Sequence, residues 1–510
     1  MQTIMRLAAG SLVLLMLPVV SGAIEIESAI RVGEAYTSNV NLDAEEENEW
    51  VTSVIPSVAV EYQGAGLELN LDYSLEALFY AEESDRNEVF HQLSANSLLD
   101  VIGDALQLHA RAAIRQVNVS PQLSVTSTNL SVTGNRTDSL TWDLGPEWGV
   151  EVFGNAIFGG FARFGRVDYD DSLRTDDSTT AATAQIADAD RIEGSASIRS
   201  SEDPTRQIGY ALVYDFEQLA YDATSYEAEQ QSAYLRVDYR LSDGFSVFGL
   251  GGLDSDFEDF EDSSLEESRW EAGATAAVGR LRLEAAIGHR FFGATQRFAL
   301  THESESVTLR LSYSTVPNTS DRMSLSQIML GQPGEDSEQE VPPDTGIEEP
   351  GLLTRFVQDR ADASVTWRGD RSSVGLAVFW DERTNQLQVE FDDETGEPVE
   401  FGERDDESSI GASARFSWNP GTRSRLGAAV SWRSRELVTD SDFTGPQLDK
   451  DQTLTVSASY GYELGELTSL SFRTGFQKRS GAANRQVGES QFVVADYDEI
   501  WVGIDLERRF

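Results

Sequence analysis

Hydrophobic and polar residues alternate along most of this chain with a period of two. In the 14 residues 67–80, LELNLDYSLEALFY, every second residue from Leu67 to Phe79 is apolar, and most of the residues between them are polar. Successive side chains of a strand point to opposite faces, so this pattern predicts a strand with one apolar and one polar face. Such a strand is longer than the roughly 5–6 residues usual in soluble sheets. It is long enough for the ~9–11 residues that a tilted membrane-crossing strand needs.

The same alternation recurs at 233–241, 307–313, 426–432 and 454–462. A soluble β-sandwich also alternates, but the connections distinguish the two folds. Short segments rich in Gly, Pro, Asn and Asp predict tight turns at 63–65, 102–104, 153–155, 202–204, 242–244, 369–370, 419–421 and 463–465. Long polar segments lie between them, at 39–48, 81–88, 119–136, 169–183, 255–265, 386–405, 437–450 and 480–495. Short turns at one end and long loops at the other are typical of outer-membrane barrels.

The charged residues within the strands indicate what lies inside such a barrel. In hydrocarbon every backbone polar group must pair within the protein, which a closed barrel achieves and an open sheet does not. The apolar face is then expected outside and the polar face in the lumen. We expect these charges to line the lumen: Glu68, Asp72, Arg236, Asp238, Arg240 and Arg310. We expect further arginines there, paired across neighbouring strands: Arg111, Arg115, Arg163, Arg282 and Arg415. The alternative is the solvated face of a soluble sheet.

Aromatic residues and both chain ends add to this picture. Trp50, Trp367 and Trp418 stand near predicted strand ends, where interfacial aromatic girdles lie. At the N-terminus, an apolar run over 7–20 is followed by small residues up to Ala23, which predicts a signal peptide over 1–23 and a mature barrel over 24–510. The alternative is a buried N-terminal helix. No later segment is apolar for the ~18 residues of a membrane helix.

Composition excludes several classes of function. The 510 residues carry 87 Asp and Glu against 39 Lys and Arg, a net charge of -48, which argues against a nucleic-acid partner. The absence of cysteine excludes thiolate metal sites, a cysteine nucleophile and a lipoprotein anchor. Of the four histidines, His91, His109 and His289 are expected to be lumen or girdle residues, and the His302-Glu303-Ser304 run lies in a predicted loop.

No phosphate-binding loop, G-x-S-x-G or H-E-x-x-H motif is present. We therefore predict that the chain is not an enzyme and uses no cofactor or metal, with a barrel-embedded hydrolase as the less favoured alternative. The acidic segments 168–171 and 254–262 could offer oxygen ligands to Ca²⁺ but lack the spacing of an EF-hand. We favour solvated loops, and weak divalent bridging of these loops to lipopolysaccharide is a hypothesis.

The number of strands follows from the turns. Counting from turn to turn gives about fourteen strands between Ile26 and Ser314 and about seven from Phe356 to Phe510. The sum is odd, whereas a barrel with both termini in the periplasm has an even number of strands. We therefore predict an all-β, transmembrane, antiparallel up-and-down barrel of about 20 strands, range about 18–22. The segment 315–355 is predicted to be a plug-like or periplasmic insertion, with a short amphipathic helix over 321–330. A barrel of this size is wide enough for an aqueous or a plugged lumen.

The C-terminal strand carries the most specific local pattern. Apolar residues share one of its faces, and the chain ends in phenylalanine; they are Ile500, Val502, Ile504, Leu506 and Phe510. This ending resembles the signal by which the barrel assembly machinery of Gram-negative bacteria recognises its substrates. That role is implied by the resemblance and not by the periodicity.

Three further segments carry a resemblance to a family. They are GEAYTSNVNL at 33–42, RADASVTWRGDR at 360–371 and YELGELTSL at 462–470. Together with the C-terminal strand, they resemble β-barrel porins associated with exopolysaccharide and PEP-CTERM (exosortase) systems. The resemblance implies an outer-membrane protein with a conduit or assembly role in exopolysaccharide export, and the predicted signal peptide implies export through the Sec pathway. It implies as partners the outer-membrane lipid and lipopolysaccharide, the assembly machinery, polysaccharide and periplasmic export proteins. A plugged anchoring barrel and a general diffusion porin are the alternatives.

Overall fold

The computed structural model describes most of the chain after the predicted signal peptide. The described residues are 23–118, 128–133, 135–170, 188–201, 206–222, 227–255, 265–319, 354–391, 398–404, 406–439, 447–481, 484–487, 490–493 and 496–510. Apart from one 3₁₀ turn at Ser84–Arg86, all regular structure among them is β. Within these ranges no helix has the length and apolarity to cross a membrane.

The strands are long, as the period-two pattern predicts. Their bounds are β1 Ala23–Thr37, β2 Glu49–Gly64, β3 Leu67–Tyr80, β4 Glu88–Asp100, β5 Leu106–Asn118, β6 Arg136–Val152, β7 Ala156–Tyr169, β8 Ala189–Ser200, β9 Ile208–Tyr221, β10 Glu227–Ser242, β11 Phe245–Ser255, β12 Leu265–Val278, β13 Leu281–Arg290, β14 Gly293–Glu303, β15 Val307–Thr319, β16 Thr354–Arg368, β17 Ser372–Phe391, β18 Pro398–Arg404, β19 Asp406–Gly421, β20 Ser424–Thr439, β21 Gln447–Gly465, β22 Thr468–Ser480, β23 Asn484–Val487, β24 Ser490–Val493 and β25 Tyr497–Arg509.

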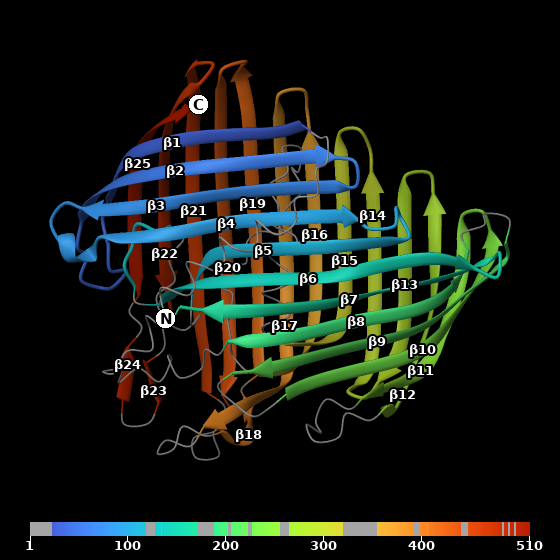
Figure 1. Ribbon diagram of the computed structural model, residues 1–510. Coiled ribbons are helices and arrows are strands. Elements are labelled where there is room, and N and C mark those ends of the chain that lie inside the picture. Colours follow the sequence, from blue (N-terminus) through green and yellow to red (C-terminus); the bar gives the residue numbers. More distant parts are fainter. Residues whose placement is uncertain are drawn as a thin grey trace.

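These strands close into a barrel. Each wall strand pairs antiparallel with its neighbours, and β25 pairs with both β22 and β1, so the sheet has no free edge. Within the described ranges the wall has 22 strands, which are all except β18, β23 and β24. Strand β18 pairs with the outer part of β17, and β23 and β24 form a separate hairpin. In Figure 1 the strands β1 to β9 cross the front of the view, and β14 to β22 run behind them at a steep angle. This crossing is expected for tilted strands on opposite sides of a barrel.

The strand register keeps one set of side chains inward around the whole wall. On β10, Leu235, Val237 and Tyr239 are outward and exposed, whereas Arg236 and Asp238 face the lumen. Because paired residues point to the same face, each strand pairing fixes which residues of the next strand face inward. The inward faces of β1 and β25 also coincide where the barrel closes, since Arg31 stands opposite Glu507. The outward face is therefore apolar and the inward face polar, as the sequence predicts.

The three tryptophans expected at the interfaces lie on the outward face. Trp50, Trp367 and Trp418 are 51%, 45% and 44% exposed. Trp50 lies at the start of β2, beside Tyr36, with a ring-centroid distance of 5.3 Å. The other two lie near the opposite end of the barrel, so exposed tryptophans stand on the outward face at both ends of the barrel.

The two ends of the barrel differ. At one end, which we call the short-turn end, tight turns such as 65–66, 243–244 and 422–423 join successive strands. At the other, the long-loop end, most connections are long. The even strand number places both termini of the barrel at the short-turn end, where the N–H of Phe510 donates to the carbonyl of Ser28 at 2.8 Å.

The count of fourteen strands in the first part of the chain was one too low. Fifteen strands, β1 to β15, precede residue 320. The four strands between Leu265 and Thr319 follow one another closely, and none of their three connections, at 279–280, 291–292 and 304–306, is among the predicted turns. The second of these consists of Phe291 and Phe292, whose apolar character continues the strand pattern through the reversal.

Parts of the predicted loops are strand. The ends of the predicted insertion, residues 315–319 and 354–355, belong to β15 and β16, while 320–353, with the predicted helix, lies outside the described residues. Strand β15 ends and β16 begins at the long-loop end, opposite the termini of the barrel. With periplasmic termini, as predicted, an insertion between these two strands would lie at the other end of the barrel and would not be periplasmic. The predicted loop 386–405 contains the end of β17 and β18, and 480–495 contains β23 and β24. Residues 1–22, with most of the predicted signal peptide, also lie outside the described ranges.

Candidate functional site in the charged lumen

All six charges predicted to line the lumen lie on inward positions of the wall: Glu68 and Asp72 on β3, Arg236, Asp238 and Arg240 on β10, and Arg310 on β15. They are spread over three sectors and do not form one site. The pairing is partly different from the prediction. Arg236 donates to Asp238 of its own strand at 3.0 Å, not to a neighbouring strand. Arg310 reaches across to Glu303 of β14 at 3.6 Å.

The other predicted arginines also face inward: Arg111, Arg115, Arg163, Arg282 and Arg415. Arg111 shows the expected cross-strand pair, with Nη2 2.7 Å from Asp143 Oδ1 on β6. These contacts depend on register and strand tilt, which set the strand neighbour that a long side chain can reach.

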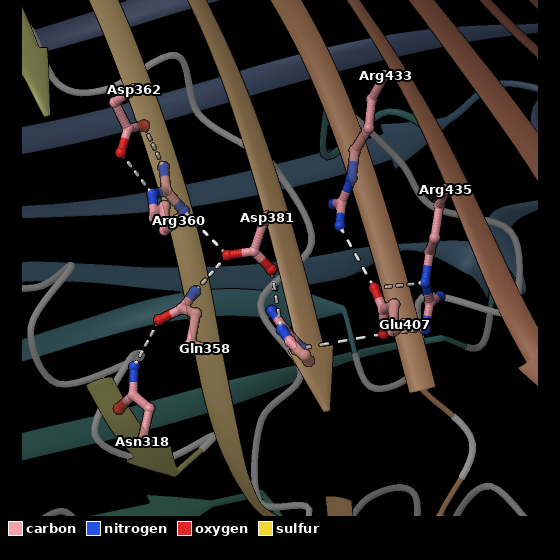
Figure 2. Close-up of polar contacts among 9 residues, drawn as sticks. Asn318, Gln358, Arg360, Asp362, Asp381, Glu407, Arg433 and Arg435 are labelled. Atoms are coloured by element: carbon pink, nitrogen blue, oxygen red, sulfur yellow. Dashed lines mark hydrogen bonds and ion pairs between the residues drawn. The ribbon is translucent and has the colours of Figure 1, made fainter. Parts of the chain in front are cut away.

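A larger network, which we call the arginine ladder, crosses β16, β17, β19 and β20 near the long-loop end (Figure 2). Its members are Arg360, Asp362, Asp381, Arg383, Glu407, Arg433 and Arg435. At its centre, Glu407 accepts from Arg435 Nε at 2.7 Å and from Arg435 Nη2 at 2.9 Å. Arg433 Nη2 lies 3.8 Å away and Arg383 Nη1 4.0 Å away.

The ladder continues to β16 through Asp381. Arg383 Nε donates to Asp381 at 3.2 Å, and Gln358 donates to the other oxygen of Asp381. Arg360 Nη1 lies 3.8 Å from Asp381, and Nε and Nη2 of the same side chain each donate to Asp362 at 2.8 Å. Figure 2 shows this alternation of guanidinium and carboxylate across successive strands. Every arginine of the ladder therefore has a carboxylate partner.

Burial determines what the ladder can do. Glu407 is 2% exposed and Arg435 1%, and Asp381 and Arg383 are buried as well. Buried charges need partners, because an isolated charge in a low-dielectric environment is costly. The ladder therefore ties four strands together at the long-loop end. The seven members carry four positive and three negative charges, so the ladder keeps a net charge of +1, and its most buried guanidinium group, that of Arg435, is paired with Glu407.

A second group of charges lies in a different sector and is uncompensated. Its members are the inward carboxylates of β1 to β3, namely Glu25, Glu27, Glu61, Glu68 and Asp72, and we call it the acidic patch. All five side chains are exposed. Among the ion pairs of the described residues, none involves them, and Glu25 stands directly opposite Glu61 in the β1–β2 register. Like charges in cross-strand positions repel, so this part of the wall attracts cations.

The residues considered for catalysis are not assembled into a site. The Ser304 hydroxyl donates to the carbonyl of Val307 at 3.0 Å within a turn, and Glu303 pairs with Arg310. His302 and His289 take outward positions, and His91 is also outward, bonded to the Tyr73 hydroxyl at 2.8 Å. His109 faces inward, 3.3 Å from Glu147.

The acidic segments considered for calcium are in part outside the described ranges. Of their described residues, Asp168 pairs with Arg166 at 2.6 Å, and Asp254 pairs with Arg290 at 2.6 Å. Over the described ranges, no group of three or more His, Cys, Asp or Glu side chains is placed to hold a metal ion.

The C-terminal strand has its predicted faces. Its apolar residues Ile500, Val502, Ile504, Leu506 and Phe510 are outward and exposed, and Trp501, Asp505 and Glu507 face the lumen. Arg508, on the outward face, stands over the ring of Phe510. The recognition of this strand by the assembly machinery stays a prediction.

Comparisons with known proteins give fold neighbours and no family. No family model matches the chain, and no curated protein matches it. Among solved structures it is similar to the siderophore receptor PirA from Pseudomonas aeruginosa, at 10% identity and a TM-score of 0.42, covering 95% of this chain and 80% of that one. It is also similar to the FrpB iron transporter from Neisseria meningitidis, at 10% identity and a TM-score of 0.41, covering 96% and 83%.

A third neighbour is OprD from Pseudomonas aeruginosa, at 10% identity and a TM-score of 0.35, covering 96% of this chain and 97% of that one. The neighbours are outer-membrane β-barrel porins and receptors. The barrel architecture of this chain rests on its own strand pairing and closure.

Proposed function

We propose that this chain is an outer-membrane β-barrel that lets small polar solutes diffuse passively, without covalent catalysis. The support is the closed wall with an apolar outward face and a charged inward face, since only such a wall satisfies its backbone within a bilayer. A barrel of 22 strands is wide enough for an aqueous lumen. Export through the Sec pathway and contact with lipopolysaccharide remain predictions from the sequence.

We infer a preference for cations, and one observation carries it. Each of the four arginines of the ladder lies beside one of its three carboxylates, whereas the carboxylates of the acidic patch are exposed and have no basic partner among the described residues. Fixed charges that line a pore set its ion selectivity. In the sector of β1 to β3 the uncompensated charge is negative, so cations are concentrated along this part of the lumen and anions are depleted there.

Planar-bilayer recordings test both parts of the proposal. Purified protein should give stable conductance steps, and a salt gradient should give a reversal potential of the sign for cations. The triple variant Glu61→Gln, Glu68→Gln, Asp72→Asn should move the reversal potential toward zero. Glu34→Gln is the matched control, because Glu34 faces outward and bonds to Thr52. A silent protein contradicts the channel, and a triple variant indistinguishable from the control contradicts the selectivity.

Export of exopolysaccharide is a narrower prediction whose support is the sequence resemblance. Deleting the gene should then reduce secreted polysaccharide, and an unchanged amount contradicts this role without touching the channel. A structural, plugged barrel is the remaining alternative; zero conductance of a correctly folded protein, also after removal of 320–353, would favour it.

A further inference from the structure

The first long loop, residues 38–48, is folded into the barrel; we call it the inner loop. Its side chains Val40 and Leu42 are fully buried. Val40 packs against Val51, Leu78 and Phe90, which are inward residues of β2, β3 and β4 near the long-loop end. The acidic loop predicted from the sequence therefore has an apolar underside attached to the inner wall.

A second segment, residues 128–133, lies against the same wall; we call it the strap. It belongs to the connection between β5 and β6, yet its partners are elsewhere. The side chain of Asn129 donates to Glu76 of β3 at 2.6 Å, and the hydroxyl of Tyr80 donates to the carbonyl of Leu130 at 3.2 Å. The N–H of Val132 donates to the carbonyl of Val40 in the inner loop at 2.7 Å.

The far end of the strap reaches β25. Ser131 Oγ donates to Glu499 Oε1 at 2.8 Å. In the order of the wall, β25 is five strands away from β5. At about 4.8 Å between strands, this is about 24 Å of wall. A connection that only bridged β5 and β6 at the rim would not make these contacts with inward side chains, so the strap crosses the inner surface.

Glu499 joins both segments to the wall. The same carboxylate oxygen accepts from Thr37 Oγ1 at 2.7 Å, at the point where β1 passes into the inner loop. Glu499 is fully buried, and its other oxygen has no hydrogen-bond partner among the described residues. Asn39 adds a tie by donating to the carbonyl of Asp498 at 3.1 Å.

The backbone of the inner loop indicates that the buried position is enforced. Leu42 has φ of +50°, a left-handed conformation that is unfavourable for a non-glycine residue. Its side chain is fully buried, and the free energy gained by burying a leucine is large enough to offset that strain. The attachment of Leu42 therefore outweighs its backbone cost.

The edge of the inner loop away from the wall is acidic. Glu45 and Glu46 are exposed, and Glu47 accepts from Arg86 at 3.1 Å and from Asn41 at 2.8 Å. These hydrogen bonds lower the pKa of Glu47 and keep it ionised. The loop thus presents apolar residues to the wall and carboxylates to water.

We propose that the inner loop and the strap form a fixed constriction at the long-loop end, fastened by Glu499, that sets the bore of the channel and lines it with carboxylates. The proposal rests on the channel function proposed above.

Its size follows from geometry. With 22 strands tilted near 40°, the backbone radius is about 22 Å, which leaves a lumen radius of about 17 Å after side chains. A layer about 10 Å thick over about 24 Å of wall takes up roughly a quarter of that cross-section. Releasing the layer should therefore raise the single-channel conductance by roughly a third and admit larger polymers.

Two variants release the layer. Glu499→Ala removes the acceptor of both hydroxyl groups, and Val40→Asp places a charge in the apolar cluster. Both should raise conductance and the size of polyethylene glycol that enters the pore. Glu499→Gln keeps an acceptor oxygen and should behave like the wild type. Glu507→Ala is the matched control, since this inward carboxylate of β25 pairs with Arg31 outside the inner layer. Unchanged conductance in both release variants overturns the proposal.

A thiol-protection measurement does not depend on conduction. The chain has no cysteine, so a single introduced thiol reports alone. A water-soluble maleimide should label the exposed position of Ala44→Cys and spare that of Leu42→Cys, and Glu499→Ala should expose position 42. Protection at position 42 in a silent barrel would support the inner layer and contradict the channel. Rapid labelling at position 42 in a conducting wild-type background would overturn the inner layer alone.

Discussion

Glu407 is the residue on which the arginine ladder depends, so its neutralisation is expected to be costly. Glu407→Gln leaves Arg435, 1% exposed, without its carboxylate and removes the shared acid from Arg433 and Arg383 as well. Removing one partner from a buried ion pair costs about 3–5 kcal/mol, because the remaining charge stays desolvated. We therefore expect the free energy of unfolding to fall by about that amount.

The matched control is Glu303→Gln. Glu303 also pairs with an arginine across two strands, but the pair is separated by 3.6 Å and both side chains are at least half exposed. An exposed pair contributes about 0–1 kcal/mol, so the control should lie close to the wild type. The difference in unfolding free energy between the two variants therefore reports the effect of burial, because both variants remove one negative charge from an ion pair with arginine.

The assay is a urea titration of barrels refolded in lipid vesicles, followed by tryptophan fluorescence and by gel mobility without boiling. Replacing Glu407 and Arg435 together by methionine should recover part of the loss, since the pair is then removed without leaving its most buried cation. The reasoning is refuted if Glu407→Gln and Glu303→Gln unfold within about 1 kcal/mol of each other.

Three further changes test other parts of the wall. Leu235→Arg places a charge on the outward face, which costs about 2–4 kcal/mol at the bilayer midplane; the folded fraction in vesicles should fall, and an unchanged fraction would argue against a lipid-facing position. Gly33→Ala on β1 would bring a Cβ to 2.4 Å from Asp505 Oδ1 on β25, so the ion pair of Asp505 with Arg473 on β22 should separate, at a cost of about 1–3 kcal/mol in the same titration; a wild-type midpoint would contradict this packing. Deleting Phe510 should reduce assembly in cells and leave refolding of the purified protein unchanged; equal amounts in the outer membrane would count against the assembly signal.

The fold was largely predictable, because a barrel wall imposes one simple rule on the chain. Alternation placed Glu68 and Leu235 on opposite faces without knowledge of their neighbours, and the turns gave nearly all strands. The strand that was not counted lies in a region where the alternation is not interrupted by a recognisable turn. Phe291 and Phe292 reverse the chain there without the polar residues that usually indicate a turn. Strands β18, β23 and β24 lie within segments whose composition indicates loops.

The charged site was predictable by position and not by partner. Arg236 and Arg310 were expected in the lumen and lie there, but their partners depend on register and tilt. The ladder around Glu407 was not predictable, because its residues look like ordinary polar strand positions. The inward fold of the inner loop was not predicted either, because Val40 and Leu42 are two apolar residues within an acidic stretch. An apolar pair inside such a segment was the available signal for inward attachment.

The most direct test of the whole account is the accessibility of single introduced thiols along β10 in isolated outer membranes. The chain is free of cysteine, so Cys can be placed in turn at Leu235, Arg236, Val237 and Asp238. Charged maleimides should label positions 236 and 238, and a lipid-attached nitroxide should quench fluorophores placed at 235 and 237. Equal labelling at all four positions, or recovery of the protein in the soluble fraction, would contradict the barrel with bilayer outside and water inside.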